Sequence, residues 1–199
     1  PASAEVKVIW DPASKRVVAM KPQVSQQSDP SAFSSSQAPE VLIARHKEIA
    51  ENFISEHRQV LRLEDPGRDL KAASARHDKL GIGHFVYDQQ HQGLPVLGGQ
   101  ISVHVKDGQV TFASVGLADK LPLTVEPVVS RVEAHRKALA AAKEDAGRGI
   151  RMTANPARLL IVPLGLLRNS AEAPSLLAWE VKIVDQKRDG RYSTNFYVD

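Results

Sequence analysis

Hydrophobic and polar side chains alternate with a period of two between residues 70 and 115, and this feature limits the possible folds more than any other. Asp107 and Gly108 interrupt the alternation, and this dipeptide favours a two-residue turn in which both residues have positive φ. The sequence therefore predicts an antiparallel meander. Its four strands are expected at Leu70 to His77, Gly83 to His91, Leu94 to Val105 and Gln109 to Val115.

A helical spacing precedes this meander. Pro39 suits the first turn of a helix, and Pro66 with Gly67 cannot continue one. We therefore expect an amphipathic helix that begins near Pro39 and ends before Pro66. Its apolar stripe would contain Leu42, His46, Ile49, Phe53 and Val60.

The first forty residues divide into a hairpin and a linker. Two short apolar runs, Glu5 to Trp10 and Lys15 to Met20, flank Asp11 and Pro12, which favour a turn. The segment at about 22–38 is rich in serine and too poor in apolar side chains to build a core. We expect it to act as a linker.

A second helix followed by strands is predicted after residue 128. Ser130 and Glu133 fit a Ser-x-x-Glu capping box, Val129 is placed to pack against Ala134, and Gly147 is a plausible end of the helix. Three further strands are expected at Arg158 to Leu167, Leu176 to Val184 and Arg191 to Val198, with Asp189 and Gly190 in the last turn.

The chain thus contains a helix followed by antiparallel strands twice, which predicts an α+β fold made of two modules, each a helix packed on an antiparallel β-sheet. Two prolines interrupt the pattern at residues 118–127, and we place the boundary there. The expected domains are 1–119 and 120–199.

Composition excludes several classes of function. The chain has no cysteine, which excludes disulfides, thiolate metal sites and cysteine nucleophiles. It has no apolar run long enough to span a membrane. The net charge of +3 comes from a local excess at residues 131–151, and aromatic residues make up 5% of the chain, so we expect no nucleic-acid partner and no membrane partner.

No motif for catalysis is present. The sequence lacks His-Glu-x-x-His, Gly-x-Ser-x-Gly and the phosphate-binding Gly-x-x-x-x-Gly-Lys, which indicates a chain without catalytic, metal or cofactor-binding residues. His46 and His57 are expected to flank the apolar stripe of the first helix, and His84 and His104 to have a structural role across neighbouring strands. An enzyme of unrecognised type using His84 or His104 is a weaker alternative. Both Trp10 and Trp179 are expected in the core.

The meander also carries a family pattern. Residues 80–116, LGIGHFVYDQQHQGLPVLGGQISVHVKDGQVTFASVG, resemble the FTP domain, the propeptide module of fungalysins and thermolysins. Val86, Asp88 and His91 depart from the usual pattern, Val86 standing where thermolysin-type precursors usually carry Arg. The second module is similar to the PepSY domain that follows FTP in those precursors. The residues that match the FTP pattern are Gly81, His84, Tyr87, Gln89, Gly93, Pro95, Val96, Gly98, Gly99, His104, Gly108 and Gly116.

This resemblance implies two cystatin-like modules and a prosegment of a secreted zinc metallopeptidase. Such a prosegment assists the folding of the catalytic domain, inhibits it and is removed on activation. The implied partner is the cognate metallopeptidase catalytic domain, in cis or after cleavage, and zinc is expected in that domain and not in this chain. The precursor would be exported, with its signal peptide outside this chain. A secreted FTP/PepSY module that acts in trans on a peptidase or a surface partner is the alternative.

The resemblance also separates two groups of site residues. The expected partner-binding residues are Asn195, Phe196, Tyr197, Val198 and Asp199, in an extended tail aimed at the substrate groove. The expected structural residues of the motif are His84, Gly93, Pro95, Gly98, Gly99, His104 and Gly108.

Overall fold

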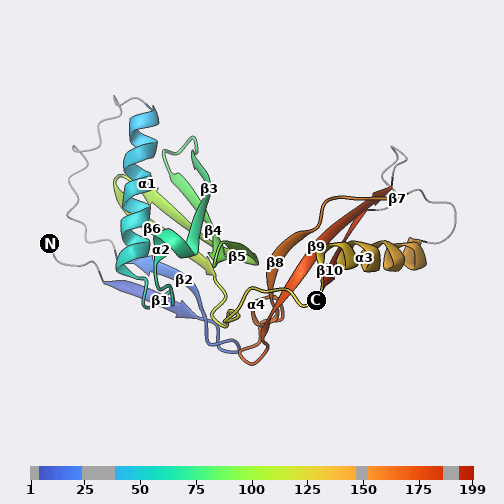
Figure 1. Cartoon of the computed structure of the whole chain (residues 1–199). Helices are drawn as coiled ribbons and strands as arrows, with labels where there is room; N and C mark the ends of the chain where they lie inside the picture. Colours follow the sequence, from blue (N-terminus) through green and yellow to red (C-terminus); the bar gives the residue numbers. More distant parts are fainter. Residues whose placement is uncertain (1–4, 24–38, 147–151, 186–192) are drawn as a thin grey trace.

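The computed structural model describes residues 5–23, 39–146, 152–185 and 193–199. Figure 1 shows two units, each with a helix beside a sheet, joined at one end and open at the other, so that together they resemble a V. The strands are β1 (Val6–Trp10), β2 (Val17–Pro22), β3 (Leu70–His77), β4 (Gly83–His91), β5 (Leu94–Lys106), β6 (Gln109–Gly116), β7 (Met152–Ala154), β8 (Arg158–Pro163), β9 (Ser175–Asp185) and β10 (Ser193–Val198). The helices are α1 (Pro39–Glu56), α2 (Pro66–Asp69), α3 (Arg131–Ala146) and α4 (Leu164–Leu167).

The predicted meander is confirmed. β3, β4, β5 and β6 pair antiparallel in chain order, and β2 and β1 extend the sheet beyond β6. Asp107 and Gly108 have φ values of 48° and 72°, so the predicted turn with two positive φ angles forms between Lys106 and Gln109. This sheet is the larger part of the first unit.

Helix α1 covers one face of this sheet. It contacts β3, β4, β5 and β6, and its Ile54 and Phe53 are buried against the strands. Phe85 and Ile101 lie in the same core. The helix ends at Glu56, so the prediction that it extends to Val60 is wrong, although Val60 still packs against the core from the turn that follows.

The predicted amino-terminal hairpin forms from β1 and β2, but one of its side chains is not where the sequence indicated. Trp10 is 50% exposed, so its predicted place in the core is wrong. It ends β1, an edge strand, at a shift in register between Ile9 and Trp10 that takes its side chain out of the regular alternation.

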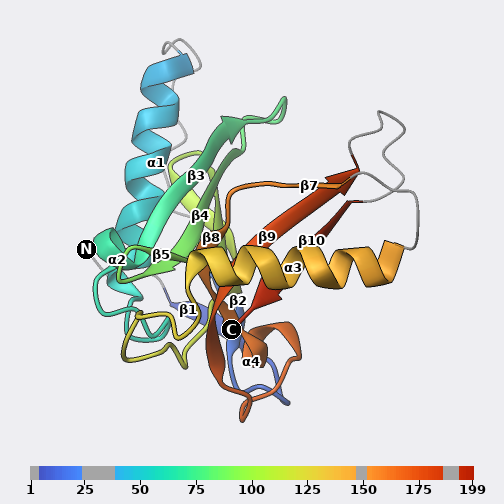
Figure 2. The same cartoon turned by 45° about the vertical axis from the view of Figure 1, so that its right-hand side comes forward.

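The second unit is built from α3 and the strands β7 to β10. Ala138 and Ala142 of α3 pack against Val181 and Ile183 of β9, and Figure 2 shows α3 lying along β9 and β10. Small alanine side chains allow the helix to approach the sheet closely. Trp179 packs against the same cluster and its indole donates to the carbonyl of Val129 at 2.7 Å, which agrees with the expected core position.

The amino-terminal cap of α3 forms partly as predicted. The Glu133 amide donates to Ser130 Oγ at 3.2 Å. The carboxylate of Glu133 faces Lys137 and Arg136 instead, at 3.8 and 3.9 Å. Gly147, Asp189 and Gly190 lie outside the described residues.

Two elements of the second unit differ from the sequence-based expectation. The strand expected from Arg158 to Leu167 ends at Pro163, and residues 164–167 form α4. Gly165 explains the tight turn, because a Cβ there would lie 2.8 Å from the carbonyl oxygen of Ala173. The short strand β7 was not predicted.

The two units share a strand. Near its start β5 pairs with β8 in parallel, Val96 opposite Ile161, and farther on it pairs with β6. The sheets are therefore continuous, in the order β1-β2-β6-β5-β8-β9-β10, and not wholly antiparallel as expected. The fold is mixed α/β and dominated by sheet. The division into domains 1–119 and 120–199 stays a prediction.

Candidate partner-binding surface and the junction between the units

The junction depends on a bend in β5. Gln90 pairs with Pro95 and Asp88 with Gln100, so four residues of β5, 96–99, lie opposite the single residue Gln89. Gly98 makes the bend possible, because its φ of 71° lies in the left-handed region that favours glycine. The bend directs the first part of β5 toward β8 and the second part toward β6.

Gln89 fastens the chain where it leaves the first unit. Its side chain is buried, and its amide donates to the Ala118 carbonyl while its oxygen accepts from the Ala118 amide, both at 2.8 Å. Gly99 leaves room for this side chain, because a Cβ at residue 99 would lie 2.7 Å from Gln89 Oε1. The Gln and Gly of the motif therefore form one structural unit with Ala118.

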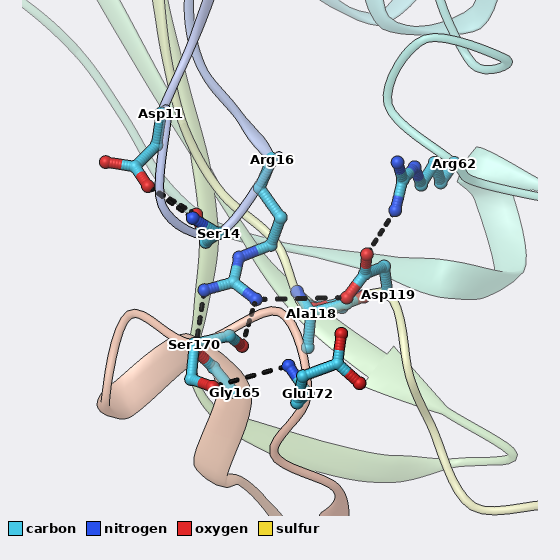
Figure 3. Close-up of polar contacts among 10 residues, drawn as sticks. Asp11, Ser14, Arg16, Arg62, Ala118, Asp119, Gly165, Ser170 and Glu172 are labelled. Atoms are coloured by element: carbon cyan, nitrogen blue, oxygen red, sulfur yellow. Dashed lines mark hydrogen bonds and ion pairs between the residues drawn. The ribbon is translucent and has the colours of Figure 1, made fainter.

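Arg16 connects the two units (Figure 3). It lies in the turn between β1 and β2, is 7% exposed, and donates to the carbonyl oxygens of Gly165 at 2.6 Å and Ser170 at 3.3 Å. The carboxylate of Asp119 lies 3.9 Å from the guanidinium and also pairs with Arg62. We call Arg16, Asp119, Gly165 and Ser170 the Arg16 junction. It joins the amino-terminal hairpin, the connecting segment and the α4 loop.

Asp11 shapes the hairpin turn that carries Arg16. Its carboxylate accepts from the Ser14 amide at 2.6 Å and from the Ser14 hydroxyl at 2.8 Å, and these bonds hold the pKa of Asp11 below its usual value. Asn169 also donates to this carboxylate, at 3.3 Å. The Asp11 carboxylate therefore binds both to its own hairpin turn, through Ser14, and to the α4 loop, through Asn169.

The structure brings His84 and His104 together across β4 and β5. Their Nδ1 atoms lie 2.8 Å apart, and His84 Nε2 lies 2.9 Å from Asp78. An ionised carboxylate can only accept, so His84 Nε2 donates to the Asp78 carboxylate. This bond lowers the pKa of Asp78 to about 2, while burial lowers the pKa of His104. The structural role of both histidines stays a prediction.

A second histidine pair lies on the opposite face of the sheet. His46 is 2% exposed and contacts His77 at 3.0 Å, from Nδ1 to Nε2. Burial lowers the pKa of His46. His46 is part of the buried face of α1, which confirms its predicted place on the apolar stripe, whereas the expectation that it flanks this stripe is wrong. His57 follows the last turn of α1 and stacks on Phe53.

The remaining motif residues lie in turns and at the start of β5. Gly93, with a φ of 80°, turns the chain between β4 and β5, and Pro95 pairs with Gln90 directly after it. Gly108 completes the next turn. Their places are consistent with the structural role that the resemblance implies, which stays a prediction.

The predicted partner-binding residues form the last strand and not a free tail. Residues 195–198 pair with β9, and β10 is the end strand of the described sheet. Phe196 and Val198 pack against the core of the second unit, whereas Asn195 and Tyr197 lie on the opposite face. Asp199 follows at the end of β10, and Figure 2 marks it as the C-terminus.

Glu180 organises the polar face of the second unit. One of its oxygens accepts from Arg158 at 2.8 Å, and the other accepts from Asn195 and the Tyr197 hydroxyl, both at 3.3 Å. Burial raises the pKa of Tyr197. A cavity of about 230 Å³ lies beside this network, lined by Asn155, Pro156, Arg158, Glu180, Lys182 and Asn195. This polar face and the free edge of β10 form the candidate partner-binding surface.

Sequence reasoning missed Arg16 and Asp119. A charged residue in a hairpin turn resembles any solvated turn residue, and no local pattern reveals that a loop far along the chain will cover it. Gln89 was included in the family pattern, but its bond to Ala118 was not foreseen. Among the described residues no group of three or more His, Asp or Glu side chains is placed to hold a metal ion.

A family model matches the meander of the first unit. Residues 68–115 match the Fungalysin/Thermolysin Propeptide Motif. The matched segment comprises α2 from Arg68 on and most of β3 to β6, and includes Gln89 and both glycines of the bend. It supports a propeptide of that peptidase family, which implies a catalytic domain as partner. None of the helices in the described ranges is long and apolar enough to cross a bilayer.

Proposed function

We propose that this chain is the prosegment of a secreted zinc metallopeptidase, which inhibits the catalytic domain, assists its folding and is removed on activation. The match of residues 68–115 to the propeptide motif carries the proposal. The chain itself catalyses nothing and holds no cofactor on this proposal, and zinc belongs to the partner domain. The precursor is exported and acts outside the cell.

The second unit is proposed to be a PepSY domain, and both units to be cystatin-like. A helix packed on antiparallel strands in each unit supports this comparison: α1 on β3 to β6, and α3 on β9 and β10. The bend in β5 and the Arg16 junction would then hold the two domains at a defined angle, so that a partner meets both.

The strand β10 is proposed as the main contact with the peptidase. An edge strand has unpaired backbone groups that bind an extended chain, and a peptidase binds its substrates as extended strands. Asn195 and Tyr197 would provide side-chain contacts, and Asp199 would follow toward the substrate groove. Phe196 and Val198 contribute by fixing the strand on α3.

Covalent attachment would strengthen this inhibition. A prosegment tethered to its catalytic domain is present at roughly millimolar effective concentration, so modest contacts keep the active-site groove covered until the connection is cut. After cleavage the same contacts are diluted and the inhibitor dissociates or is degraded.

A test compares β10 variants as inhibitors of the cognate catalytic domain. Replacing both Asn195 and Tyr197 by alanine is expected to raise the inhibition constant at least about tenfold, because tyrosine is among the residues that contribute most to binding at interfaces. The matched control is Arg136→Ala on α3, whose side chain is 74% exposed and lies away from the polar face. Equal inhibition by both variants contradicts a contact through β10.

The alternative function is a separate secreted module that binds a peptidase or a surface partner in trans. The two proposals differ in the gene. A His-Glu-x-x-His sequence downstream in the same reading frame supports the prosegment, and a stop codon soon after Asp199 supports the separate module.

A further inference from the structure

A cavity at the margin of the first unit is independent of the surface described above. It has a volume of about 440 Å³ and lies where α1, α2, β3 and β4 meet. Its lining residues are Glu51, Asn52, Ile54, Ser55, Asp65, Pro66, Gly67, Leu70, Ala72 and Tyr87. β3 is the outer strand of the sheet at this margin, because among the described strands it pairs with β4 alone. No other described strand pairs with β3 on the side away from β4.

The base of this cavity is apolar with one polar atom. Ile54, Leu70 and Tyr87 are buried, with 2%, 7% and 4% of their surface exposed. The Tyr87 hydroxyl has no hydrogen-bond partner among the described residues, although buried polar groups almost always have one. An unsatisfied hydroxyl in the cavity lining is the position at which a bound group would gain a hydrogen bond without displacing an existing one.

The rim of the cavity is acidic. Glu51 and Asp65 contribute carboxylates, Asn52 and Ser55 contribute neutral polar groups, and no Lys or Arg lies among the lining residues. Two of the nearby basic residues already have partners: Lys47 pairs with Glu51 at 3.5 Å across an exposed surface, and Arg68 pairs with Glu64 and Asp69. The negative charge of Glu51 also acts on Tyr87, whose pKa is raised by burial first and by this carboxylate second.

We propose that this cavity, which we call the Tyr87 pocket, binds a lysine or arginine side chain of a partner polypeptide. The aliphatic part of such a side chain matches the apolar base formed by Ile54 and Leu70, and its charged end matches the carboxylates of Glu51 and Asp65. Lysine and arginine donate hydrogen bonds and accept none, which fits a rim of oxygen acceptors. The volume accommodates either side chain.

This inference does not rest on the proposed peptidase partner. It concerns the first unit and a different face from β10, so that failure of one proposal leaves the other unaffected. A second polypeptide contact on the first unit would add to whatever partner β10 binds.

The test uses the full chain and short capped peptides with one central residue. Amide chemical shifts are followed while Ac-Ala-Lys-Ala-amide, its arginine analogue and a norleucine analogue are added up to about 5 mM, in the weak range expected for a single side chain. We expect shifts centred on Glu51, Ser55 and Gly67 with lysine and arginine. Norleucine, which keeps the stem and lacks the charge, is expected to bind at least tenfold more weakly.

Two variants and a control locate the effect. Glu51→Gln and Tyr87→Phe are each expected to weaken binding severalfold, whereas Glu48→Gln, an exposed carboxylate on α1 outside the pocket lining, leaves it unchanged. Asp65 is unsuitable because it caps α2 by accepting from the Gly67 amide. Butylamine carries the lysine side-chain amine without a peptide backbone, and its binding is compared with that of the lysine peptide. Stronger binding of butylamine contradicts a polypeptide ligand.

Stability of Tyr87→Phe gives an independent test. Removing a buried hydroxyl without a partner leaves the melting temperature equal or higher, because no hydrogen bond is lost. A marked fall means that the hydroxyl is already satisfied inside the fold. That result, equal binding of norleucine and lysine, or shifts spread evenly over the surface overturns the proposal.

Discussion

Arg16 and Gly165 are 149 residues apart in the sequence, yet the guanidinium of Arg16 donates to the Gly165 carbonyl at 2.6 Å. This bond joins the amino-terminal hairpin to the loop around α4 in the second unit (Figure 3). Asp119, in the connecting segment, provides the compensating charge. A side chain that belongs to the first twenty residues thus contacts both the connecting segment and the second unit.

Replacing Arg16 by alanine is expected to lower the free energy of unfolding by about 2–3 kcal/mol, because two carbonyl oxygens and a carboxylate lose a charged donor. Denaturant unfolding measures this, and small-angle scattering measures the spread between the units, which is expected to increase. Arg16→Lys keeps the charge, but its ammonium group cannot bind both carbonyls as the planar guanidinium does. Its free energy of unfolding is therefore expected to lie between those of the unchanged chain and Arg16→Ala.

Arg62→Ala is the matched control for this experiment. Arg62 pairs with the same Asp119, but its side chain is 51% exposed, and such pairs contribute about 1 kcal/mol or less. An equal loss of stability in Arg62→Ala and Arg16→Ala contradicts the role given to the Arg16 junction.

Gly99→Ala is expected to destabilise the chain by about 1–3 kcal/mol, because the added methyl group overlaps the Gln89 side chain that holds Ala118. Thermal unfolding measures the loss. Gln89→Gly in the same background tests the cause: it removes both Oε1 and Cβ, the two Gln89 atoms that the new methyl group would overlap, so the loss in the double variant should be smaller than the sum of the two single losses. Strict additivity would show that Gly99 is needed for another reason.

Stability is expected to decrease as the pH falls below about 6.5, the usual pKa of histidine. The pKa values of His46 and His104 are lowered in the folded chain, so the unfolded chain binds more protons in this range and acid favours unfolding. Burial is the main cause of both shifts. The pKa of His46 is also shifted by the charges of His77, Asp107 and Arg45, and the pKa of His104 by those of His84, Arg76 and Asp78.

Denaturant midpoints between pH 8 and pH 5 measure this dependence. His104→Gln, which has no imidazole to protonate, is expected to flatten the curve, and an unchanged slope in this variant shows that His104 does not contribute to it. A further loss is expected between pH 3.8 and about 2, because the pKa of Asp78 is lowered over that interval and its bond to His84 is lost on protonation.

Local signals in the sequence predicted most of the elements. The Asp107–Gly108 turn and the Ser130 cap were found because each depends on residues that are adjacent or one helical turn apart. The strand expected at Leu176 to Val184 was predicted for the same reason, and the structure has it as β9.

Features that depend on distant parts of the chain were not predicted. The parallel pairing of Val96 with Ile161 divides β5 between two partners, and alternation within one strand carries no information about its neighbours. Arg16 and Trp10 have the same explanation. Arg16 is buried because the α4 loop covers it, and Trp10 is exposed because β1 is an edge strand of the sheet.

The most direct test of the account adds this chain to the cognate zinc metallopeptidase catalytic domain, both while that domain refolds and after it is active. The account predicts a higher yield of active enzyme in the first case and slower peptide hydrolysis in the second, at about micromolar concentration, the range of moderate interfaces. No change in either measurement contradicts it, as does turnover of a peptide by this chain alone.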